Sequence, residues 1–73
     1  MKAKFWNVGI EIYEDGTVKA AVMRSRVATI QPADGYRREP RREVYSVWFI
    51  SYLEAQSAVI EALEMNVTQE VAA

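Results

Sequence analysis

The most constraining feature of the chain is a run of alternating side chains that ends in a turn signal. Over residues 4–13 the side chains alternate with the period of a β-strand. Asp15 and Gly16 follow, and this dipeptide is typical of a type I′ turn, in which both central residues have positive φ. A second strand is expected from Thr17 to about Val27. The sequence therefore predicts an antiparallel β-hairpin.

A two-residue loop also fixes the register of this hairpin, because a shift of one residue would move every side chain to the other face. The predicted pairs are Glu14 with Thr17, Ile12 with Lys19, Ile10 with Ala21, Val8 with Met23, and Trp6 with Ser25. The predicted core side carries Trp6, Val8, Ile10, Ile12, Ala21, Met23 and Val27. The opposite face carries Phe5, Asn7, Glu11, Tyr13, Val18, Ala20, Val22, Arg24 and Arg26.

The next segment, residues 28–43, contains both prolines and four arginines. We expect a long basic loop or extended arm here, and loops of this length are often functional. Residues 44–50 then predict a third strand, whose consecutive apolar residues are typical of a strand covered on both sides. Its orientation is open: the face away from the helix receives either Tyr45, Val47 and Phe49 or Val44, Trp48 and Ile50.

A helix is expected after the third strand. Ser51 and Glu54 have the spacing of a capping box, and Asn66 can adopt the left-handed conformation that ends helices. Residues 68–73 are expected to fray. The predicted fold class is α+β, with a three-stranded antiparallel sheet packed on one C-terminal helix in the order strand, strand, strand, helix. Residues 1–67 form one domain.

The size of the chain limits its core. A chain of 73 residues buries only about 60% of its extended surface, and without cysteine this one has no disulfide to compensate. No apolar run reaches the length of a membrane span, and no signal peptide is evident. We therefore expect a cytoplasmic protein that does not insert into a membrane.

Most catalytic chemistry is disfavoured by composition. The chain has no His and no Cys, which removes an imidazole base, a thiolate nucleophile and the usual zinc ligands. Three scattered glycines form no phosphate-binding loop. We expect no enzymatic activity, no cofactor and no metal site.

The charges divide sharply along the chain. Residues 1–42 contain all nine basic residues against five acidic ones, whereas residues 43–73 contain five glutamates and no basic residue. Arginine forks suit phosphate or carboxylate, so the first segment can contact nucleic acid and the helix can present an acidic partner surface. The candidate nucleic-acid residues are Arg24, Arg26, Tyr36, Arg37, Arg38, Arg41 and Arg42. The candidate acidic surface consists of Glu54, Glu61 and Glu64.

Apolar side chains are also in surplus on the face away from the helix. A single helix cannot cover both faces of a sheet, and large exposed aromatic patches are typical of interfaces. The residues assigned to a self-association face are Phe5, Tyr13, Val18, Val22, Tyr45, Val47 and Phe49. Cover by the long loop, through Ile30, Pro32 and Tyr36, is the alternative.

Two functions follow from these surfaces. The first is a small non-enzymatic accessory protein that binds an unidentified protein partner and acts as a homodimer through its aromatic sheet face. The alternative is a nucleic-acid-binding adapter that uses the arginine-rich segment and the two arginines of the second strand.

Overall fold

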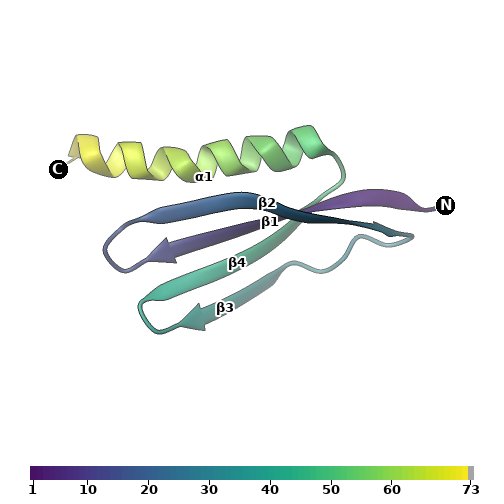
Figure 1. Ribbon diagram of the computed structural model, residues 1–73, viewed down its shortest axis with the longest axis horizontal. Coiled ribbons are helices and arrows are strands. Elements are labelled where there is room, and N and C mark those ends of the chain that lie inside the picture. The colour runs from purple at the N-terminus through teal and green to yellow at the C-terminus, as the bar shows by residue number, and fades with distance from the viewer. Residues whose placement is uncertain (73) are drawn as a thin grey trace.

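The computed structural model describes the backbone of residues 1–72 and the side chains of residues 1–66. The elements in chain order are β1 Ala3–Tyr13, β2 Val18–Ala28, β3 Gly35–Glu39, β4 Arg42–Phe49 and α1 Tyr52–Ala72. The strands form one antiparallel sheet in the order β2-β1-β4-β3, with α1 running along β2 and β1 (Figure 1). The predicted α+β class, with an antiparallel sheet and one C-terminal helix, is confirmed. The predicted number of three strands is wrong, because the sheet has four.

The additional strand comes from the arginine-rich segment. Residues 28–43 were expected to form a loop, but β3 pairs with β4 from Gly35↔Ser46 to Glu39↔Arg42. Pro40 and Arg41 are the two loop residues, and Arg41 has a φ of 69°. Proline followed by a residue with positive φ is the pattern of a type II turn, in which glycine is usual at the second position. Because Arg41 occupies the position where glycine is usual, the sequence gives little indication of a turn here.

The first hairpin forms as predicted but with a different turn. The Tyr13 and Thr17 backbones pair through a 2.8 Å hydrogen bond, and the Gly16 amide donates to the Tyr13 carbonyl at 2.9 Å. The loop therefore has three residues, and only Gly16, with a φ of 92°, has positive φ. This is a type I turn followed by a left-handed glycine rather than the predicted type I′ turn.

The longer loop shifts the hairpin register by one residue. Ile12 pairs with Val18 instead of Lys19, so the side chains of residues 18–22 lie on the face opposite to the predicted one. A β-bulge between Asn7 and Val8 then restores the predicted pairing of Trp6 with Ser25. The face assignment was thus wrong for residues 18–23 and right for the remainder of β2.

The register defines two faces of the sheet. We call the face under α1 the helix-side face and the other the open face. From these two hairpins and the β1–β4 pairing, the helix-side face carries Trp6, Val8, Ile10, Ile12, Val18, Ala20, Val22, Tyr36, Arg38, Glu43, Tyr45, Val47 and Phe49. The open face carries Phe5, Asn7, Gly9, Glu11, Tyr13, Lys19, Ala21, Met23, Arg24, Arg26, Arg37, Glu39, Arg42, Val44, Ser46 and Trp48.

The helix packs closely through small residues. Ala55 and Ala62, one heptad apart, are buried against the sheet, where Val8 is fully buried. The predicted Ser51 cap is confirmed, since its Oγ accepts a hydrogen bond from the Glu54 amide at 3.1 Å. The helix continues past Asn66, where the sequence analysis ended it, to Ala72. The fraying expected for residues 68–73 stays a prediction, and Ala73 lies outside the described residues.

Asn66 attaches the helix to the free edge of the sheet. Its side-chain Oδ1 accepts from the Val18 amide and its Nδ2 donates to the Val18 carbonyl, both at 2.7 Å. The side chain thereby replaces a neighbouring strand at the start of β2. Trp6 and Tyr52 meet edge to face, with ring centroids 5.0 Å apart, and hold the other end of the helix.

Replacing Asn66 tests this attachment. We expect Asn66→Ala to lower the free energy of unfolding by roughly 1–3 kcal/mol, because the two backbone groups of buried Val18 lose their partner. Urea denaturation followed by circular dichroism measures the change. Gln56→Ala, at an exposed position of the same helix, is the matched control. Equal stability of the two variants would contradict the assigned role.

Candidate functional site

The most distinctive arrangement on the open face is an indole covered by two arginines. The guanidinium carbons of Arg24 and Arg26 each lie 5.6 Å from the centroid of the Trp48 ring. Trp48 is only 5% exposed, although no helix covers this face. The two arginines therefore shield the ring with their stems and cationic heads, while their own side chains are exposed.

A polar group supports the sheet beside this ring. Asn7 pairs with both Arg24 and Trp48 across the strands and is buried. Its Nδ2 donates to Ser46 Oγ at 2.8 Å and to the Val47 carbonyl at 3.4 Å. These bonds satisfy the buried side-chain amide of Asn7 and hold it in place beside the Trp48 ring.

The connection between β2 and β3 completes the edge of β4. Just before β3 begins, Asp34 Oδ1 accepts a hydrogen bond from the Trp48 amide at 2.8 Å. Gln31 Nε2 donates to the Trp48 carbonyl at 2.9 Å. The segment thus runs along the edge of the sheet, and Ile30 is 80% exposed. The alternative in which Ile30, Pro32 and Tyr36 cover one face is not what the structure has.

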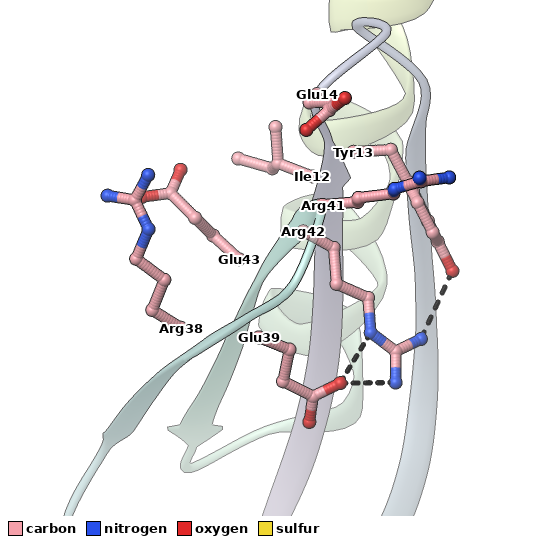
Figure 2. Close-up of a pocket in the computed structure, with 8 residues that line it drawn as sticks. All are labelled: Ile12, Tyr13, Glu14, Arg38, Glu39, Arg41, Arg42 and Glu43. Atoms are coloured by element: carbon pink, nitrogen blue, oxygen red, sulfur yellow. Dashed lines mark hydrogen bonds and ion pairs between the residues drawn. The ribbon is translucent and has the colours of Figure 1, made fainter.

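The turn end of the open face is an ion-pair network. Arg42 contacts Glu39 through Nε at 2.6 Å and Glu11 through Nη1 at 2.7 Å, and its Nη1 also donates to the Tyr13 hydroxyl at 3.3 Å. Arg37 pairs with the same Glu39. Figure 2 shows Arg42 reaching toward Glu39 and Tyr13 on one side of the ribbon, with Arg38 and Glu43 on the other. The Arg37 and Arg42 charges are therefore largely neutralised.

This network shifts the ionisation of its members. The Tyr13 hydroxyl, which donates to Glu11 at 2.6 Å, and the Arg42 guanidinium lower the pKa of Glu11. Hydrogen bonds from Arg42 and Arg37 lower the pKa of Glu39. The hydrogen bond with Tyr13 and those to Glu39 raise the pKa of Arg42. All three groups are charged at neutral pH.

The open face as a whole is basic. It carries five basic side chains against two carboxylates, since Lys19, Arg24 and Arg26 join the Arg37–Arg42 network. Within the part of the chain that the structure describes, these first three residues form no ion pair. Lys19 instead lies over the Tyr13 ring, with Nζ 5.2 Å from the centroid. Lys19 lies across from Glu11 and helps to lower the pKa of that carboxyl, so the uncompensated positive charge is that of Arg24 and Arg26, which lie opposite Asn7 and Phe5.

The remaining predicted nucleic-acid residues lie elsewhere. Tyr36 and Arg38 are on the helix-side face, where the Tyr36 hydroxyl donates to Glu43 at 2.8 Å and its ring packs on Tyr45. The bond to Glu43 raises the pKa of Tyr36. Arg41 is in the β3–β4 turn. The structure thus places Arg24, Arg26, Arg37 and Arg42 on one face, with Arg24 and Arg26 far along the sheet from Arg42, and places the other three elsewhere.

The two other predicted surfaces are also divided or relocated. Of the predicted self-association residues, Phe5 and Tyr13 lie on the open face and the other five on the helix-side face. Val18 is buried there, and Phe5 is buried on the opposite side. Glu54 and Glu61 line a shallow groove between α1 and Phe49 of β4, and Glu64 is an exposed residue of the same helix. The acidic residues are therefore on the layer opposite to the basic face.

The described residues contain no group of three or more carboxylates that could hold a metal ion. None of the helices in this part of the chain is both long and apolar enough to cross a membrane. The chemistry that the open face offers is ionic and stacking contact through guanidinium groups, an ammonium group and aromatic rings.

Comparisons with protein-family models, curated proteins and solved structures found no match to this chain. The function is therefore argued from the residues of the open face themselves.

The Glu11–Arg42–Glu39 network predicts an acid-sensitive contribution to stability. Because the folded-state pKa values of both glutamates are lowered, the unfolded chain binds protons first as the pH falls. This stabilisation is complete above the ordinary glutamate pKa of about 4.3 and is lost as the pH falls through the lower folded-state values. We expect Glu39→Gln to flatten the dependence of urea midpoint on pH below this range.

The matched control is Glu14→Gln, at an exposed position in the neighbouring turn. Its side chain forms no ion pair among the residues that the structure describes. The control should retain the pH profile of the unmodified chain. A profile for Glu39→Gln as steep as that of the control would contradict the network.

Proposed function

We propose that this chain is a non-enzymatic binding module whose open face binds nucleic acid, chiefly through phosphate contacts. The observation that carries the proposal is the Arg24–Trp48–Arg26 stack on an uncovered sheet face. The arginine heads are held at the surface by the ring beneath them, so less side-chain freedom is lost when they contact phosphate.

The distribution of charge along β2 supports an extended ligand. Lys19 and Arg26 are seven residues apart, which corresponds to about 23 Å of strand. Phosphates on one DNA strand are about 3.4 Å apart along the helix axis, so this row can meet several of them. Among the described residues, Arg24 and Arg26 form no ion pair that must be displaced first, whereas Lys19 lies across from Glu11.

The opposite layer supports one orientation of binding. The chain has a formal net charge of −1, so it has no general attraction for polyanions. Its helix carries Glu54, Glu61 and Glu64, which repel phosphate. Attraction is therefore confined to the open face, and salt should weaken it strongly.

The binding of a separate protein partner, expected from the aromatic residues, remains a second prediction. Its assigned surface is divided between the two faces of the sheet, with Phe5 and Tyr13 on the open face and the other five residues on the helix-side face. The nucleic-acid function has the more direct support, because Arg24 and Arg26 share one face with Lys19.

Charge removal on the open face tests the proposed function. We expect Lys19→Gln/Arg24→Gln/Arg26→Gln to weaken binding of a fluorescently labelled single-stranded oligonucleotide at least ~10-fold at 50 mM salt, and equally for different sequences. With about three phosphate contacts, the unmodified chain should show a slope of log affinity against log salt of roughly −2 on single strands. Fluorescence anisotropy measures both quantities.

A matched control removes charge from the helix-side face. Lys4→Gln/Arg38→Gln changes two exposed residues of that face and should leave the affinity within about twofold. Circular dichroism verifies that both variants are folded. Absence of binding by the unmodified chain at 50 mM salt, or an equal loss in the control, would exclude the open face as a nucleic-acid surface.

A further inference from the structure

Half of the helix-side face has no covering layer. A helix is about 10 Å wide, whereas four strands at about 4.8 Å spacing make a sheet nearly twice that width. α1 packs mainly on β2 and β1, touches β4 less, and does not contact β3 (Figure 1). The part covered least, which we call the aromatic half-face, carries Tyr36, which is 54% exposed, and the half-buried Tyr45, Val47 and Phe49.

The helix itself has an exposed apolar surface. Leu53 is 74% exposed, Ile60 is 55% exposed and Leu63 is 40% exposed. With Gln56 they recur at alternating intervals of three and four residues, which is the spacing of a helix–packing seam. We call Leu53, Ile60 and Leu63 the outer helix stripe.

The surface area of the monomer indicates how large the missing contact is. The chain exposes 5368 Å², about 800 Å² more than is usual for a folded monomer of 8.3 kDa. Its radius of gyration is 13.6 Å, against roughly 11 Å for a compact domain of this length. The monomer thus exposes enough surface to supply the ~800 Å² that each partner buries in a standard protein interface.

We propose that the occupant is a second copy of this chain, with the outer helix stripe of each copy packed on the aromatic half-face of the other. A two-fold axis parallel to the helices generates both contacts at once and closes the assembly. The two helices then lie side by side between two sheets, and each sheet is covered by one helix from each copy. The inference is independent of the proposed nucleic-acid function.

The other surfaces that a second copy could use are less suitable. Contact between two open faces would bring Arg24 and Arg26 against the same charges of the other copy. The β2 edge is interrupted by the bulge and by Asn66, which bonds both backbone groups of Val18. The β3 edge is five residues long and carries the Arg37–Glu39 pair. A second helix on the aromatic half-face lies beside Glu54 and Glu61, which line the groove between α1 and Phe49, and Arg38 on the same face supplies a positive charge for the carboxylates of that helix.

Sedimentation velocity tests the assembly. We expect a concentration-dependent species near twice 8.3 kDa, which Leu53→Glu/Ile60→Glu converts to a monomer. Both positions are exposed, so the variant should keep its circular dichroism spectrum. Met23→Glu/Ile30→Glu, at residues 64% and 80% exposed outside the proposed contact, is the matched control and should remain dimeric. A monomeric unmodified chain at about 1 mM would overturn the proposal.

The reciprocal geometry also predicts the behaviour of a second variant. Tyr36→Asp/Tyr45→Asp should also be monomeric, because it damages the aromatic half-face while leaving the stripe intact. When mixed with the stripe variant, it should form a heterodimer, since one of the two stripe–half-face contacts is then undamaged. Mixing that yields only monomers, or loss of the dimer in the Met23→Glu/Ile30→Glu control, would exclude this arrangement. A dimer formed by either variant alone would also contradict the arrangement, because both contacts are damaged in such a homodimer.

Discussion

The packing of one helix against a four-stranded sheet is the constraint on which the rest of the structure depends. Ala55 and Ala62 bring α1 close to the sheet, and the helix is attached by the contact of Tyr52 with Trp6 and by that of Asn66 with Val18. This position buries Val8 and Val18 but leaves β4 and β3 largely without cover. Both the open face and the aromatic half-face exist because α1 covers only part of one face of the sheet.

On the open face, cationic side chains lie over the aromatic rings in place of a packed layer. Arg24 and Arg26 lie over Trp48, and Lys19 and Arg42 lie near the ring of Tyr13. Long basic side chains can shield an aromatic ring while their charged heads stay in water. The same residues therefore limit the exposure of Trp48 and give the face its positive charge, which connects the packing of the sheet to its proposed function.

The sequence predicted the strand over residues 4–13, the Ser51 cap and the side of the sheet on which β1 packs, because each depends on local pattern. It did not predict the hairpin register, since Asp15-Gly16 is compatible with a two-residue or a three-residue loop. The turn at Pro40-Arg41 was not predicted because a glycine usually occupies the positive-φ position, where this chain has Arg41. Lys19 was missed as a site residue because its face depends on the hairpin register, and Trp48 was missed because the pattern of residues 44–50 leaves the orientation of that strand open.

Trp48 reports directly on the open face, and Trp6 under the helix is an internal reference. Titration of ¹⁵N-labelled protein with a single-stranded oligonucleotide, followed through the two indole N–H resonances, compares both faces in one sample. The account predicts a salt-sensitive shift of the Trp48 resonance together with the backbone amides of Arg24 and Arg26, and an unchanged Trp6 resonance. Shifts confined to Trp6 and the helix, or no shift at low salt, would contradict the assignment of the open face as the binding surface.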